Sequence, residues 1–233
     1  MSNFDNINIK QKNVLTYDDL FNRKPGKSKE PLVEVNRYNP SIIAKYMKKD
    51  MLPIVGEKIY VRDSVAKKLA RIEEKIQDKG YDLYIVYGYR HPEVQAKYFK
   101  EIKDTLKKQR PDLKGKALDE YAHIFIAVPD VAGHPAGAAL DMTIAFNGKP
   151  IDMGAEIADF DNEEKMATYA KGLTDEQIKN RKMLHDLMVE EGFAPFYGEW
   201  WHFSYGDREW AAFYDKETLY APIDFRTKNK PYF

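Results

Sequence analysis

The residues that could carry chemistry lie in two short segments that are far apart in the sequence. Near the C-terminus, Glu199 and His202 stand three residues apart within a run of aromatic side chains. Aromatic residues favour strands and buried surfaces, so two ionisable groups among them need a specific reason to be there. A metal ion is one such reason. This segment therefore indicates half of a metal site.

The second segment places His134 in a loop and Asp141 on the strand-like run that follows it. Gly137 lies between them, and a tight turn at a glycine could bring both side chains to one point. Two histidines and one aspartate make a three-ligand zinc site with a fourth position open for water, as in catalytic zinc sites. Taken alone, a histidine followed seven residues later by an aspartate also arises by chance.

Glu199 adds a function that chance does not readily supply. Hydrolysis at zinc needs a base for the attacking water and an acid for the leaving amine, and one carboxylate beside the metal can do both. On a regular strand, Glu199 and His202 would face opposite sides. The assignment therefore requires that Glu199 belong to the turn at Gly198, or that a bulge re-aim it.

Arg90 and the other histidines have less distinctive surroundings. Arg90 follows a short β-prone run, where an arginine is usually a solvated surface residue or a salt-bridge partner; the functional alternative is stabilisation of an oxyanion. His185 is read as a helix-surface or interface residue and His123 as a hydrogen-bonded core residue. His91 lies in a turn before a proline, which favours a structural role.

Composition limits the classes of function. The chain has 37 basic and 37 acidic residues, so its formal net charge is zero, and the absence of a charged stretch argues against nucleic acid or a membrane as partner. A small polar ligand is the better expectation. With no cysteine, only histidines and carboxylates remain as strong metal ligands. The N-terminus has no signal-peptide pattern, so we expect a cytoplasmic location. The sequence does not indicate an oligomeric state.

The site needs a scaffold, which we expect to be one domain over residues 36–233 preceded by an N-terminal arm over residues 1–35. Periodicity predicts helices over residues 63–80 and 174–192 and one after Pro92. Strand-like runs occupy residues 83–87, 138–146, 193–196 and 200–205. Within the run 138–146, alternation puts Leu140, Met142 and Ile144 on one face and Asp141 on the other, among small neighbours.

These motifs together resemble the zinc D-alanyl-D-alanine dipeptidases of the vancomycin-resistance type, within the zinc D,D-peptidases. The resemblance covers roughly residues 35 to 206 in the same order. It rests on His134-x-x-Gly137-x-Ala139-x-Asp141, Glu199-Trp200-Trp201-His202, the Tyr89-Arg90 turn and Asp152-Met153-Gly154. It implies an α+β fold of the hedgehog/D,D-peptidase type, with a central antiparallel sheet flanked by helices.

The resemblance also implies the roles of particular residues. One zinc ion per chain would be held by His134, Asp141 and His202. Glu199 would act as general base and then as general acid, and Arg90 would stabilise the tetrahedral intermediate. The substrate would be the free dipeptide D-Ala-D-Ala, split to two D-alanines.

Substrate contacts depart from the family pattern. Ala132 stands where the family usually has serine, and Ala136 where the dipeptidases often have arginine. The acid that recognises the free amine falls at Ala158, with Asp159 beside it as the replacement, and Trp200 and Trp201 are further candidates for substrate contact.

Two alternatives therefore stay open. One is a D,D- or L,D-carboxypeptidase acting on longer cell-wall peptides. The other is a zinc-stabilised binding module without turnover, against which the presence of Glu199 argues.

Overall fold

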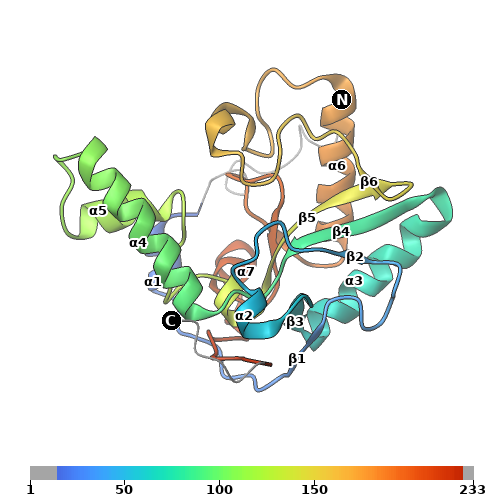
Figure 1. Cartoon of the computed structure of the whole chain (residues 1–233), viewed down its shortest axis with the longest axis horizontal. Helices are drawn as coiled ribbons and strands as arrows, with labels where there is room; N and C mark the ends of the chain where they lie inside the picture. Colours follow the sequence, from blue (N-terminus) through green and yellow to red (C-terminus); the bar gives the residue numbers. More distant parts are fainter. Residues whose placement is uncertain (1–14, 228–233) are drawn as a thin grey trace.

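The computed structural model describes residues 15–227, and its framework is one six-stranded sheet (Figure 1). The strands lie in the order β2-β4-β5-β8-β7, and β6 pairs with β5. Their bounds are Ile43–Ala44 (β2), Tyr81–Tyr87 (β4), Ala139–Phe146 (β5), Lys149–Pro150 (β6), Ala194–Pro195 (β7) and His202–Ser204 (β8). All pairings are antiparallel except that of β2 with β4. The predicted α+β class is confirmed, and this parallel edge is the one difference from the predicted antiparallel sheet.

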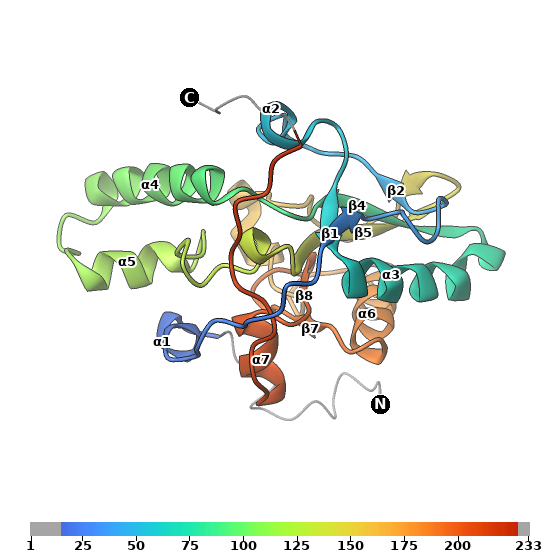
Figure 2. The same cartoon turned by 90° about the horizontal axis from the view of Figure 1, so that it is seen from below.

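Two helices, α3 (Asp63–Ile76) and α6 (Asp175–Glu190), cover one face of the sheet (Figure 2). Because side chains alternate across a strand, Leu140, Met142 and Ile144 of β5 all project to this face, and all three are fully buried. They form one core cluster with apolar side chains of both helices. The predicted alternation along this strand is confirmed, and it leaves Asp141 on the opposite face.

The remaining elements surround the sheet. α4 (Pro92–Gln109) and α5 (Lys116–His123) pack side by side and project away from the sheet in both views (Figures 1 and 2). β1 (Leu32–Glu34) and β3 (Tyr60–Arg62) form a separate two-stranded sheet. The other helices are α1 (Tyr17–Phe21), α2 (Leu52–Val55), α7 (Arg208–Tyr214) and the 3-10 helices η3 (Gln77–Lys79), η4 (His134–Ala136) and η5 (Phe160–Lys165). Within residues 15–227, no helix is long and apolar enough to cross a membrane.

Several boundaries follow from local side-chain chemistry. Thr174 and Gln177 form the predicted capping box at the start of α6, each side chain bonding to the backbone N–H of the other. Gly80 closes the segment after α3 in a left-handed conformation (φ +79°), and β4 begins at the next residue. The apolar run over residues 122–128, which periodicity does not assign, contains the end of α5 and then turns.

The predicted N-terminal arm is described only from residue 15, and residues 1–14 lie outside the described part of the chain. In the described part, α1 packs against α7, and Arg23 pairs with Asp215 at 3.3 Å. β1 pairs with β3, which attaches the end of the arm to the body. The division at residue 35 into arm and catalytic domain stays a prediction.

Glu73 is a fully buried acid on α3. Its Oε2 accepts a hydrogen bond from the backbone N–H of Leu83 (2.8 Å), and the carboxyl of Asp82 is a neighbour that also raises its pKa. Burial raises the pKa of this carboxyl to about 7, against the opposing effect of the Leu83 hydrogen bond. The folded state thus retains a proton that the unfolded chain releases near pH 4.5. Its stabilising contribution is complete below that pH and lost as the pH rises through about 7.

We expect Glu73→Gln to raise the free energy of unfolding at pH 8 by about 1–3 kcal/mol, because glutamine keeps an acceptor for Leu83 and carries no charge. Denaturant unfolding of both proteins at pH 8 and pH 5 measures the effect, and the difference should shrink towards pH 5. Glu74→Gln, on the exposed side of the same helix, is the matched control. An equal difference at both pH values would show that burial of the charge is not its cause.

Candidate active site

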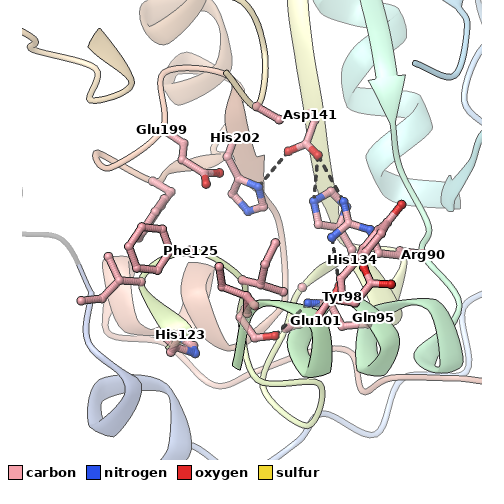
Figure 3. Close-up of a pocket in the computed structure, with 18 of the residues that line it drawn as sticks. Arg90, Gln95, Tyr98, Glu101, His123, Phe125, His134, Asp141, Glu199 and His202 are labelled. Atoms are coloured by element: carbon pink, nitrogen blue, oxygen red, sulfur yellow. Dashed lines mark hydrogen bonds and ion pairs between the residues drawn. The ribbon is translucent and has the colours of Figure 1, made fainter. Parts of the chain in front are cut away.

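Two paired strands hold two of the predicted ligands side by side. Asp141 of β5 pairs directly with His202 of β8 in antiparallel register. Residues directly opposite each other on antiparallel strands project to the same face, with Cβ atoms about 4.5–5.5 Å apart. Nδ1 of His202 accordingly lies 3.1 Å from Oδ1 of Asp141 (Figure 3). The register of the sheet therefore sets this pair.

His134 reaches the same point from η4, just before β5. Gly137 ends η4 in a left-handed conformation (φ +68°), and a Cβ there would lie 2.2 Å from a side-chain carbon of Leu32. This turn, at the predicted glycine, brings Nε2 of His134 to 3.3 Å from Oδ2 of Asp141. The other ring nitrogen, Nδ1, lies 2.7 Å from the carbonyl oxygen of Gly88. A hydrogen bond to that carbonyl places the proton on Nδ1 and leaves the lone pair of Nε2 facing Asp141.

The three side chains form a cluster that fits a metal ion. Ligand atoms of His134, Asp141 and His202 lie within 4.8 Å of one another, and no other such group of three occurs within residues 15–227. Imidazole nitrogens and carboxylate oxygens bind divalent transition metals at about 2.0–2.2 Å. Their separations of 3.1 and 3.3 Å are those of neighbouring ligands on one such ion. Three protein ligands also leave a position for water.

Burial and the neighbouring charges set the protonation states of the three clustered side chains. Burial alone would raise the pKa of the Asp141 carboxyl, but the adjacent rings of His134 and His202 hold it well below its ordinary range. Burial lowers the pKa of His134, which favours the neutral imidazole that binds metal. Burial would also lower the pKa of His202, but the carboxylates of Glu209 and Asp141 raise it well above its ordinary value. A metal at His202 would compete with a proton for the ring nitrogen.

Glu199 belongs to the turn between β7 and β8. Its backbone N–H donates to the carbonyl of Phe196 (3.0 Å), and its own carbonyl accepts from the N–H of His202 (3.3 Å). β8 begins only at His202, so strand alternation does not oppose the two side chains. Figure 3 shows the Glu199 carboxylate beside the His202 ring. Burial raises the pKa of this carboxyl to about 8, although the neighbouring His202 opposes the rise.

Arg90 follows β4 and approaches Asp141 from the side of His134 (Figure 3). Its backbone N–H donates to the carbonyl of His134 (3.2 Å), and its Nη1 donates to Oε1 of Gln95 (3.0 Å). Its Nη2 lies 3.6 Å from Oδ2 of Asp141, and the guanidinium stacks on Tyr87 at 4.3 Å from the ring centroid. Arg90 is thus an ion-pair partner in the site, and the interpretation as a solvated surface residue is wrong.

A cavity of about 790 Å³ opens from the cluster and follows α4 and α5. Arg90, Glu199 and Trp201 line it near the three ligands, and Glu101 and Arg110 line it along α4 and at its end. In Figure 3, His123 lies across the cavity from the cluster. A substrate in this space would meet the metal cluster, the acid Glu199 and the cation Arg90 together.

The three predicted substrate-binding residues differ in their surroundings, and substrate contact stays a prediction for each. Trp201 lines the cavity although it is buried in the same core cluster as Trp200. Trp200 is buried in the core, with the guanidinium of Arg181 5.5 Å from its ring centroid, and does not belong to the lining. Asp159 is half-buried at the start of η5 and also lies outside the lining. Its neighbour Ala158 lines the cavity, in a left-handed conformation (φ +56°).

The other histidines do not join the cluster. His91 caps α4, where its Nδ1 accepts a hydrogen bond from the backbone N–H of Glu93 (3.2 Å). His123 accepts from the backbone N–H of Val128 (3.1 Å) and lines the cavity. His185 is buried against Tyr197, which excludes an exposed helix surface and leaves the second alternative, a packed interface.

Two acidic residues of the site were missed in the sequence. Glu209, in the first turn of α7, has Oε2 3.5 Å from Nε2 of His202. Asp207 caps α7 and packs against Gly133. A Cβ at Gly133 would lie 1.9 Å from Oδ2 of Asp207, so this position before His134 favours glycine. Acids are common at helix starts, so neither residue carries a signal of its own in the sequence.

Comparison with known proteins adds a family to this geometry. A family model of the M15 peptidases, described as D-ala-D-ala dipeptidase, matches residues 42–222. The chain belongs to this peptidase family. The D-alanyl-D-alanine dipeptidase of Synechocystis sp. is 32% identical over 188 residues, covering 69% of this chain and 75% of that protein. The D-alanyl-D-alanine dipeptidase of Enterococcus faecalis is 28% identical over 131 residues, which cover 53% of this chain and 62% of that protein.

A solved structure of VanYB in complex with D-Alanine-D-Alanine is similar at a TM-score of 0.47 and 16% identity, covering 90% of this chain and 95% of that one. The family match confirms the predicted resemblance and the predicted peptidase class. The matched residues, 42–222, include Arg90, Glu199 and the three residues of the metal cluster.

Proposed function

We propose that this peptidase hydrolyses the dipeptide D-Ala-D-Ala to two D-alanines and uses one zinc ion per chain. The observation that carries the proposal is the metal cluster beside Glu199 on one cavity, in a chain of this family. The names of the Synechocystis and Enterococcus relatives support the dipeptide as substrate. A ligand set of two histidines and one aspartate, with room for water, favours zinc of the catalytic kind.

The side chains around the ligands have roles that suit hydrolysis. Zinc, when bound, lowers the pKa of a water ligand and polarises a carbonyl. Glu199 would take the proton of the attacking water and pass it to the leaving amine, and its raised pKa suits a group that must both accept and release a proton near neutrality. Arg90 would place its guanidinium beside the carbonyl oxygen as that oxygen becomes negative.

A second candidate is a carboxypeptidase that trims longer D,D- or L,D-peptides of the cell wall. The shape of the cavity favours it, because cavities of roughly 300–1,000 Å³ hold drug-sized ligands and a free dipeptide is much smaller. The cavity of about 790 Å³ has room along α4 and α5 for more of a peptide chain. Ala158 lines it where the resemblance implies an acid for the free amine.

Rates on matched substrates separate the two candidates. The zinc-loaded protein would be given free D-Ala-D-Ala, its N-acetyl derivative, a tripeptide that ends in D-Ala-D-Ala and an L,D-dipeptide. A dipeptidase should cleave the free dipeptide fastest, because it recognises the amine. Faster cleavage of the acylated and longer peptides would favour the carboxypeptidase over the dipeptidase. If none of these substrates were cleaved, both candidate functions would be rejected.

A further inference from the structure

α7 places a partly buried carboxylate beside one of the proposed zinc ligands, in the lining of the same cavity. Oε2 of Glu209 lies 3.5 Å from Nε2 of His202, and each of the two side chains is 12% exposed. The helix is held in place next to Glu209, because Nε1 of Trp210 donates to the carbonyl of Gly192 (2.9 Å). Glu209 therefore approaches His202 from a fixed element.

Helix capping does not explain this position. Asp207 already caps α7, and its Oδ1 accepts from the backbone N–H of Trp210 (2.8 Å). An acid in the first turn also interacts favourably with the helix dipole, but that interaction needs no burial. A buried carboxylate is costly unless it is paired. Oε1 of Glu209 has no hydrogen-bond partner within the described part of the chain, and Oε2 faces the ring of His202.

The ring of His202 lies between two carboxylates. Its Nδ1 is 3.1 Å from Asp141, and its Nε2 faces Glu209. A metal shared with Asp141 would use Nδ1, so Nε2 would carry the proton and direct it towards Glu209, 3.5 Å away. His134 has the same arrangement with its nitrogens exchanged, because Nε2 faces Asp141 and Nδ1 faces the carbonyl of Gly88 (2.7 Å). Such outer partners fix the tautomer and orientation of metal-binding histidines.

We propose that Glu209 is a positioning residue that holds His202 as its Nε2–H tautomer and thereby strengthens zinc binding. The inference rests on the proposed function, since it takes zinc as the metal at His134, Asp141 and His202. Glu209 acts through His202, so its effect should appear in metal affinity as well as in activity.

Zinc affinity is the test, measured on zinc-free protein by competition with a chelator of known affinity. We expect Glu209→Ala to bind zinc about 10–100-fold more weakly than the wild type. Glu209→Gln keeps the shape and an acceptor oxygen but not the charge. Its zinc affinity should lie between that of Glu209→Ala and that of the wild type. Glu163→Gln, which changes another acid that lines the cavity, is the matched control and should bind zinc as the wild type does.

Nitrogen NMR of the histidine rings in the zinc-loaded wild type gives a second readout. We expect a protonated Nε2 and a metal-bound Nδ1 for His202, and the opposite tautomer would overturn the inference. It would also be overturned, with the proposed function left intact, if both Glu209 variants bound zinc as tightly as the wild type. A wild type that binds no zinc would reject both. If circular dichroism shows Glu209→Ala to be unfolded, the glutamine variant decides.

Discussion

Glu199→Gln is expected to lower kcat for D-Ala-D-Ala by about 10²–10⁴-fold while the protein keeps its zinc. Glutamine has nearly the same size and cannot take a proton from water or give one to the leaving amine. Glu199 lies in the turn before β8 and is not one of the three clustered ligands, so its replacement should leave the metal in place. Zinc content and the rate of D-alanine release, measured on the same preparation, give both quantities.

The control for this prediction is Glu176→Gln, the same chemical change on the exposed first turn of α6. It should leave both zinc content and rate unchanged. Turnover by Glu199→Gln at the wild-type rate would remove Glu199 from the mechanism. Loss of zinc from that variant would instead give Glu199 a role in metal binding.

His134→Ala should abolish zinc binding and hydrolysis together. His134 supplies one of the three proposed protein ligands, and its Nε2 lies 3.3 Å from Oδ2 of Asp141. Alanine at this position leaves only two protein ligands for the ion. We expect zinc affinity to fall by more than about 100-fold, because removal of a residue that only hydrogen-bonds to a ligand already costs up to about 100-fold. Chelator competition and elemental analysis after dialysis measure the loss.

His123→Ala is the matched control, because His123 also lines the cavity but lies across it from the cluster (Figure 3). It should keep stoichiometric zinc. Stoichiometric zinc in His134→Ala would mean that the ligand set is wrong, and loss of zinc from both variants would point to a general effect on folding.

The sequence predicts the site best where local rules act. The alternation of bulky and small residues along β5 places Asp141 on the face away from the core, and Gly137 permits the left-handed turn that brings His134 to it. The sequence left two possibilities for Glu199, and the structure places it in the turn, because β8 begins only at His202.

Features set by tertiary packing could not be predicted in the same way. Trp200 and Trp201 are adjacent, chemically identical and both buried, yet only Trp201 belongs to the cavity lining, while the guanidinium of Arg181 from α6 lies 5.5 Å from the ring centroid of Trp200. Glu209 reads as an ordinary acid of a first helical turn until α7 is docked beside His202. The parallel pairing of β2 with β4 involves two residues of β2, too few for any pattern in the sequence.

The most direct test of the central claim is D-alanine release from free D-Ala-D-Ala by chelator-treated protein, before and after zinc is restored in stoichiometric amount. We predict no release from the zinc-free protein and full recovery once zinc is bound. Hydrolysis that persists without metal, or zinc-loaded protein that releases no D-alanine, would contradict the account.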